Sequence, residues 1–182
     1  MALSLFIWII IAIILLVVII FISYYNRFSV LSNRIDNSLS QIDVQLKRRA
    51  DLVPNLLETV KGYAKHEKTI IKDVTDARKA LVSAGNLTSR VKAGAQLQSA
   101  LRSVFAIAEN YPQLRANENF LQLQEELATI EDRIAYARQS YNDSILSYNN
   151  LATTFPGTIF GKPKREFLEI AAEEKATPKV SF

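Results

Sequence analysis

Few side chains in this sequence belong to the types that commonly catalyse reactions or bind metals. His66 is the single histidine, and the chain contains no cysteine. A metal site built between helices needs several converging ligands, for example Glu-x-x-His motifs on two helices, and no second histidine can complete one. We therefore interpret His66 as a surface residue at a helix bend rather than a ligand or catalyst, and we expect no metal and no cofactor.

Two acidic pairs are the next candidates, because paired carboxylates can act as a general acid and a general base. The pairs Glu125-Glu126 and Glu131-Asp132 occupy consecutive positions, and consecutive side chains of a helix do not face each other. Surface charges are the favoured interpretation, with an acid/base pair as the alternative. No arrangement of a nucleophile and a base stands out, so no catalytic residue is assigned.

The segment GTIFGKP at residues 157–163 is the nearest match to a phosphate-binding loop. It is one residue short between its glycines, and it has proline where the metal-binding serine or threonine belongs. This pattern predicts a turn.

A repeated Tyr-Asn dipeptide, Tyr141-Asn142 and Tyr148-Asn149, is the most distinctive polar feature. The two copies are one heptad apart, so both tyrosines fall on the same face of a helix. Buried tyrosine rings need partners for their hydroxyls. We interpret the repeat as part of a helix core, with a contact to another subunit as the alternative.

The elements that position these residues begin with an uncharged apolar run at residues 3–22, LSLFIWIIIAIILLVVIIFI. At about 1.5 Å per residue, a helix of this length covers roughly 30 Å, the thickness of the hydrocarbon core of a bilayer. The run is longer than the core of a signal peptide, and it lacks the basic start and the small-residue cleavage site. We predict one uncleaved membrane-spanning helix, with the lipid bilayer as its partner.

The formal net charge is +4, and Lys and Arg are interspersed with Asp and Glu along the chain. Basic residues do not line one helix face with aromatic ones, so no nucleic-acid binding is expected. Arg27 and Arg34 follow the apolar run closely, which favours a cytoplasmic domain; the outer side is the alternative. Lys47, Arg48 and Arg49 are interpreted as a solvated face, with a partner contact or lipid as the alternatives.

Apolar residues recur at steps of three and four over residues 24–62, which predicts an amphipathic helix. No glycine or proline separates it from the apolar run, so the two are expected to form one rod. Pro54 lacks the amide that would bond the carbonyl of Ala50, and a kink is expected there. Asp43 lies four residues before Lys47, a spacing for an ion pair on the wet face.

Two shorter helices are predicted next, at residues 69–83 and 88–110. The loop at residues 83–86 contains Gly and Asn, which tolerate the backbone angles that end helices. Thr88 or Ser89 is expected to cap the helix that follows.

The most regular apolar pattern runs from Phe120 to Leu151, with steps of three and four over more than four heptads. Asn119, with Asn117 as the alternative, is expected to cap this helix of about 35 residues, which would be about 50 Å long. The helix over residues 24–62 has a matching length. The sequence therefore predicts an all-α fold in which a transmembrane helix continues into an antiparallel long-helix bundle.

The expected domains are a membrane anchor at residues 1–23, a helical bundle at residues 24–155 and a tail at residues 156–182. The end of the tail, residues 175–182, is expected to be disordered. Four apolar side chains of the tail are expected either to enter the membrane interface or to close the base of the bundle: Ile159, Phe160, Phe167 and Leu168.

Three long segments carry a resemblance to a known family. They are QIDVQLKRRADLVPNLLETVKGYAKHE at residues 41–67, ENYPQLRANENFLQLQEELATIEDRIAYARQSYNDSILSYNN at residues 109–150, and FPGTIFGKPKREFLEI at residues 155–170. Together they closely resemble the LemA family of bacterial membrane proteins. The resemblance implies one N-terminal span in the inner membrane, a short outer N-terminus and a cytoplasmic long-helix bundle.

The family resemblance implies little about activity, although some relatives are linked to membrane organelle formation or to membrane-stress proteases. In this chain Pro163 and Lys164 occupy a stretch that is often more apolar in relatives. Our leading hypothesis is a non-enzymatic, membrane-anchored scaffold or adaptor that forms homo-oligomers or organises other membrane proteins. The alternatives are an accessory subunit of a membrane enzyme, such as a membrane-stress protease, and a hydrolase in which His66 or Glu131 would be essential.

Overall fold

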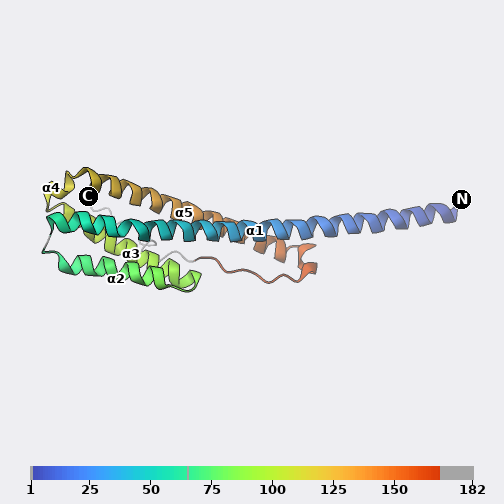
Figure 1. Ribbon diagram of the computed structural model, residues 1–182. Coiled ribbons are helices and arrows are strands. Elements are labelled where there is room, and N and C mark those ends of the chain that lie inside the picture. The colour runs from blue at the N-terminus through green and yellow to red at the C-terminus, as the bar shows by residue number, and fades with distance from the viewer. Residues whose placement is uncertain (1, 65, 169–182) are drawn as a thin grey trace, which may run out of the picture. The chain divides into compact units, whose positions relative to one another are not determined.

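The fold of this protein was obtained as a computed structural model that describes residues 2–64 and 66–168. These residues contain helices and no strand, which confirms the predicted all-α class. The elements are α1 (Ala2–Tyr63), α2 (Lys68–Ser83), α3 (Leu87–Ala108), α4 (Pro112–Arg115), α5 (Glu118–Thr153) and the 3-10 helix η1 (Gly157–Phe160) (Figure 1). The expectation of disorder at residues 175–182 lies outside the described residues.

The chain divides into two compact units, and the long helices α1 and α5 contribute to both. The first unit comprises Met1–Ser38 and Ser140–Phe167. The second comprises Leu39–Gln139 and Leu168–Phe182, and so contains α2, α3 and α4. Each unit has its own buried side chains.

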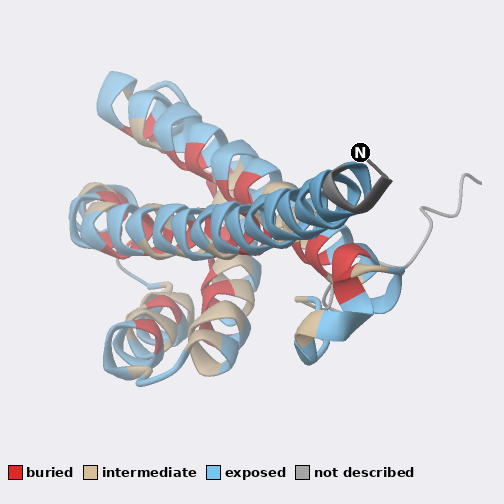
Figure 2. Ribbon diagram, turned by 90° about the vertical axis from the view of Figure 1, so that its right-hand side faces the viewer, coloured by how far each residue is buried: buried red, intermediate tan, exposed pale blue. Residues whose placement is uncertain are grey.

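The N-terminal part of α1 is apolar on every side and exposed on every side. An 18-residue window of this helix has the composition of a membrane span, and none of its residues is buried (Figure 2). Among the described residues α1 is the one helix long and apolar enough to cross a membrane. A helix that is hydrophobic all round is stable in lipid or in a large core, and no protein core covers this one.

In the first unit, α1 and α5 run antiparallel. The ring of Phe28 meets the ring of Tyr148 edge-on, with centroids 5.5 Å apart. Further along α1, the hydroxyl of the buried Ser38 lies 3.2 Å from that of Ser140. Residue numbers therefore rise along α1 as they fall along α5, which confirms the predicted direction of the pairing.

The second unit shows the same pairing with a different core. Arg49 of α1 binds Glu131 of α5, and Tyr63 at the end of α1 accepts a 3.1 Å hydrogen bond from Asn117. The α2 and α3 helices lie side by side as a hairpin (Figure 1). Apolar side chains from four helices are almost fully buried here: Ile42, Leu46, Val53 and Leu56 of α1, Val74 of α2, Leu97 and Leu101 of α3, and Leu127 and Ile134 of α5.

Two helices begin at asparagine caps that differ from the first-choice caps of the sequence analysis. The α3 cap is Asn86, whose side chain accepts from the Ser89 amide at 2.8 Å, so the expected caps Thr88 and Ser89 are wrong. At α5 the side chain of Asn117 accepts from the Phe120 amide at 3.0 Å, so the alternative cap is the correct one and Asn119 is not the cap. In both cases the asparagine three residues before the bonded amide has the geometry of an N-cap.

Pro54 lies inside α1 without ending it. The ring nitrogen carries no hydrogen, so the carbonyl four residues earlier, that of Ala50, loses its helical partner. Arg78 of α2 supplies a replacement, because its Nε donates to the Ala50 carbonyl at 2.8 Å. Since Ala50 is 1% exposed, this contact satisfies a carbonyl that water cannot reach.

This replacement predicts a coupling between Pro54 and Arg78. Arg78→Met should lower the free energy of unfolding by about 1–3 kcal/mol, the cost of an unsatisfied buried acceptor. In a Pro54→Ala background the new amide can bond Ala50, so the same change at Arg78 should cost clearly less. Chemical unfolding of the full chain in detergent would measure this double-mutant cycle.

Lys79→Met is the matched control for the loss of charge on α2, because the Lys79 side chain is 72% exposed and pairs with Asp76 in the neighbouring turn. It should change stability little. Equal costs of Arg78→Met in the two backgrounds would contradict the assignment.

Candidate functional site

The structure places the single histidine on the surface. His66 is exposed, in the short connection between α1 and α2. The carboxylate of the neighbouring Glu67 accepts a 3.1 Å hydrogen bond from the Tyr111 hydroxyl, and this bond, together with the charge of Glu67, raises the pKa of Tyr111. Within residues 2–64 and 66–168, His, Asp and Glu form no group of three or more suited to hold a metal ion. Glu67 thus joins two helix ends.

The two acidic pairs differ in exposure and in their partners. Glu125 and Glu126 are exposed, and Glu126 accepts a 3.0 Å bond from Gln122 one turn earlier. Asp132 is also exposed, but Glu131 forms a salt bridge with Arg49. Glu131 is 29% exposed, so it lies partly on the surface as expected, but it is paired with Arg49. The sequence analysis missed this partner because Arg49 lies on another helix.

Arg49 is the buried charge of the second unit. Its side chain is 3% exposed, so the interpretation of Lys47, Arg48 and Arg49 as one solvated face is wrong for Arg49. The guanidinium also donates to the carbonyl of Gly94 on α3 at 3.4 Å. A Cβ on Gly94 would lie 2.6 Å from a methyl of Leu46, so the glycine lets α3 approach α1 closely. Arg49 thereby links α1, α3 and α5.

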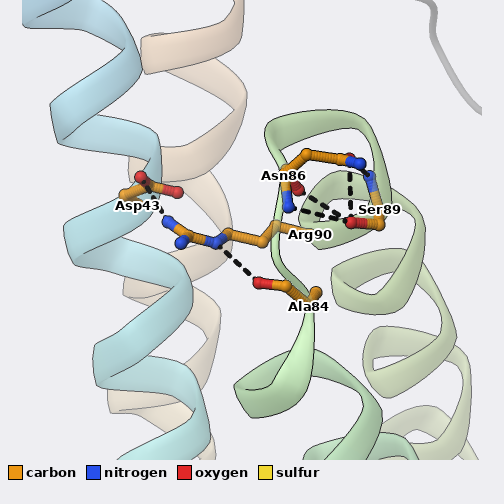
Figure 3. A network of polar contacts seen from close by, with 5 residues as sticks. All are labelled: Asp43, Ala84, Asn86, Ser89 and Arg90. Atoms are coloured by element: carbon orange, nitrogen blue, oxygen red, sulfur yellow. Dashed lines mark hydrogen bonds and ion pairs between the residues drawn. The ribbon is translucent and has the colours of Figure 1, made fainter.

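An ion pair on the other side of α1 also differs from the helix-neighbour prediction. Asp43 pairs with Arg90 of α3 at 2.7 Å, and Arg90 also donates to the carbonyl of Ala84 at 3.1 Å (Figure 3). The capping box of Asn86 and Ser89 holds the α3 end that carries Arg90 (Figure 3). Both partners are about two-fifths exposed, so the contact positions the start of α3 more than it stabilises the fold.

Two open grooves of the second unit flank α1. One, of about 570 Å³, is lined by charges of both signs together with the apolar Leu52 and Ile130; the charged residues are Arg48, Asp51, Glu125, Glu126 and Arg133. The other, of about 450 Å³, combines the Asp43–Arg90 pair with Lys47, Arg78 and the exposed Val44 and Val82. In both, charged groups of opposite sign line the groove, a composition that suits contact with a polar partner surface.

The Tyr-Asn repeat takes a structural role in the first unit. Tyr141 and Tyr148 are buried, as predicted for a helix core. Burial raises the pKa of the Tyr141 phenol; the nearby Arg165 opposes this rise, and Asp36 adds to it. The sequence therefore located the rings correctly but gave no sign of Arg165 beside them.

Arg165 ties the tail to both long helices of the first unit. Its backbone amide donates to the side chain of Asn149 at 2.8 Å, and its carbonyl accepts from the same side chain at 2.9 Å. The guanidinium lies 4.8 Å from the ring centroid of Tyr148 and donates to Ser32 of α1 at 2.8 Å. The second residue of the Tyr-Asn dipeptide thus holds the tail, a role the sequence analysis missed.

The predicted turn at residues 157–163 is confirmed as η1, closed by Gly161 in the left-handed conformation at φ 58°. Its Phe160 packs on α1, with ring centroids 4.9 Å from Phe21, 6.2 Å from Tyr24 and 5.6 Å from Phe28. Phe160 therefore closes the base of the unit, one of the two expected outcomes. The other tail side chains are more open: Ile159 is 69% exposed, Phe167 is 49% exposed and Leu168 is half-buried.

These features define a class of helical protein with an N-terminal segment suited to span a membrane and a helical region whose apolar core contains an ion pair with a buried arginine. Residues 38–182 match the LemA family, and the chain belongs to this family.

Curated relatives agree with this assignment. The chain is 27% identical over 158 residues to a protein named magnetosome protein MamQ of Magnetospirillum gryphiswaldense, covering 72% of this chain and 58% of the relative. It is 29% identical over 124 residues to a protein named LemA of Metamycoplasma hominis, covering 68% and 57%. Two MamQ proteins of Paramagnetospirillum magneticum are 26% identical. The chain thus spans less than two thirds of the length of these relatives.

The burial of Arg49 predicts that Glu131 is needed for folding. Glu131→Ala leaves the buried guanidinium without its carboxylate and should cost about 3–5 kcal/mol of unfolding free energy. The double variant Arg49→Met/Glu131→Leu should recover much of this loss. Thermal unfolding followed by circular dichroism would measure both, with the exposed neighbour Asp132→Ala as the control. A Glu131→Ala protein as stable as the control would refute the assignment.

The two bonds from Asn149 predict that Asn149→Ala loosens the tail. Trypsin should then cut faster after Lys164 and Arg165, because the backbone amide and carbonyl of Arg165 lose their hydrogen-bond partners. The matched control is Asn150→Ala, since the neighbouring Asn150 is exposed. Limited proteolysis followed by mass spectrometry would give both rates, and equal rates would contradict this role of Asn149.

Proposed function

We propose that this protein is a non-enzymatic, membrane-anchored helical scaffold or adaptor, which assembles with copies of itself or organises other membrane proteins. The observation that carries this proposal is the continuity of α1. A fully exposed apolar segment and a helix built into a protein core belong to one unbroken helix, Ala2–Tyr63. No loop therefore separates the apolar segment from the part of the helix that enters a protein core.

The use of the charged side chains supports a role in assembly over a role in catalysis. Glu131 forms a salt bridge with Arg49, Asp43 forms one with Arg90, and Glu67 accepts a hydrogen bond from Tyr111. Each of these contacts joins separate elements of the fold. A catalytic carboxylate instead needs access to a substrate.

The relatives are in keeping with this proposal, since several are named for the magnetosome and one bears the family name LemA. The mixed-charge groove beside Glu125 and Glu126 offers a polar surface for a partner. An accessory subunit of a membrane enzyme, such as a membrane-stress protease, is the second candidate. It would use the same surfaces for a different partner.

We propose that the anchor lies in the bacterial inner membrane with the helical domain in the cytoplasm. Arg27 and Arg34 follow the apolar segment closely, and basic residues near a span are retained on the cytoplasmic side. The chain lacks cysteine, so Ser99→Cys on the exposed surface of α3 would provide a unique label site. An impermeant maleimide should label this site only after the cells are permeabilised.

Self-assembly can be tested by cross-linking the full chain in membranes and again after reconstitution at increasing ratios of lipid to protein. A specific assembly should keep its cross-linked species on dilution with lipid, whereas chance collisions should disappear. Monomers alone at every ratio would overturn the homo-oligomeric scaffold. One stoichiometric partner recovered in mild detergent would instead favour the accessory subunit.

The role of the apolar segment as a membrane anchor can be tested by deleting it. A protein lacking residues 1–22 should leave the membrane fraction, because the insertion free energy lies in that segment. Retention of this truncated protein on membranes would show that the span is not what holds the protein there.

A further inference from the structure

We propose that residues 155–164 form a second contact with the bilayer, beside the membrane-spanning part of α1. In this contact Phe155 and Ile159 enter the boundary between headgroups and acyl chains, and Lys162 and Lys164 face anionic headgroups. The inference rests on the proposed membrane anchor and adds to it a lipid-binding surface made by the C-terminal turn.

The depth of this segment follows from its contacts with α1. The ring of Phe160 stacks on Phe21 at 4.9 Å and on Tyr24 at 6.2 Å. Phe21 belongs to the apolar run, and Tyr24 with Tyr25 follows it directly, where aromatic residues mark the membrane–water interface. Because Phe160 touches both, η1 lies at the level where the hydrocarbon ends.

Two large apolar side chains of the segment are uncovered. Phe155 is 82% exposed and Ile159 is 69% exposed, whereas Phe160 is turned onto α1. Consecutive residues of a 3-10 helix point about 120° apart, so one residue of η1 can pack on α1 while the next projects outward. Large apolar side chains held open at interface depth are the pattern of a segment that lies in the membrane surface.

The turn is held in place before it meets any lipid. Gly157 packs so closely on the end of α5 that a Cβ there would lie 1.8 Å from the carbonyl of Leu151. Asn149 and Arg165 fix the chain on the other side of the turn. Phe155 and Ile159 are therefore presented in a fixed arrangement, which reduces the entropy lost on insertion.

The charges that follow the turn fit a lipid surface. Lys162 and Lys164 are exposed, and Arg165 is occupied by Ser32 and Tyr148. The attraction of lysine to anionic lipid acts over about 8 Å at physiological salt. Lys162 and Lys164 follow Phe160 by two and four residues, so both leave the proposed interface level on the headgroup side.

The test uses the absence of cysteine in the chain. Ile159→Cys and Phe155→Cys of the full chain would each be labelled with the environment-sensitive dye NBD and reconstituted in vesicles of neutral and of anionic phospholipid. Asp143→Cys on α5 is the matched control. Asp143 is exposed and belongs to the same unit, but it lies on α5 more than a helical turn farther from the apolar segment than Tyr148. Ile159 and Phe155 are exposed, so neither cysteine substitution removes core packing.

The labels at residues 159 and 155 should emit at shorter wavelength than the label at residue 143. Lipids with a nitroxide near the headgroup should quench them several-fold more strongly than the control, and a water-soluble quencher several-fold less. Lys162→Gln/Lys164→Gln should weaken the lipid quenching in anionic vesicles and leave it unchanged in neutral ones.

Two results would overturn this inference. Equal access of the aqueous quencher to residues 159 and 143 would show that the turn stays in water. A label shielded from water yet not quenched by the nitroxide lipids would show that protein, such as a second copy of the chain, covers the surface. Cross-linking of the same samples reports on the scaffold separately, since assembly can persist with residue 159 in water.

Discussion

A helix that spans a bilayer must be unbroken, because lipid offers no water to satisfy free amides and carbonyls, and the apolar segment of α1 meets this requirement. The rest of the structure depends on this constraint. The helix continues to Tyr63 without an end, and its side chains change from apolar on all sides to apolar on one stripe. The first pattern is that of a helix surrounded by lipid, and the second is that of a helix packed against a protein core.

The core of the second unit combines apolar packing with one buried ion pair. Arg49 is buried, and Glu131 together with the Gly94 carbonyl receives its guanidinium. Such a pair adds little net stability compared with apolar side chains, but it penalises any arrangement in which the partners are apart. Arg78 acts in a related way, since it satisfies the carbonyl that Pro54 leaves open. Polar contacts here fix which helices meet.

The first unit shows how a short tail becomes part of the fold. Asn149 pairs with the backbone of Arg165, whose guanidinium lies on the buried Tyr148. Phe160 then packs against α1 at the end of its apolar segment. The tail is therefore held by the amide side chain of Asn149, the cation of Arg165 on a ring and the aromatic cluster around Phe160.

The sequence by itself determined the apolar N-terminal helix and the two long amphipathic stretches, because these depend on composition and on apolar period, which are local properties. The antiparallel pairing was predicted from the matching lengths of the two stretches, and the structure confirmed it. It also placed the rings of Tyr141 and Tyr148 in a core. The partners of Arg49 and Asn149 were decided only by the tertiary structure, since each lies on an element distant in sequence. Helix periodicity tells which side chains share a face, but charge and polarity alone cannot tell which of them another helix will cover.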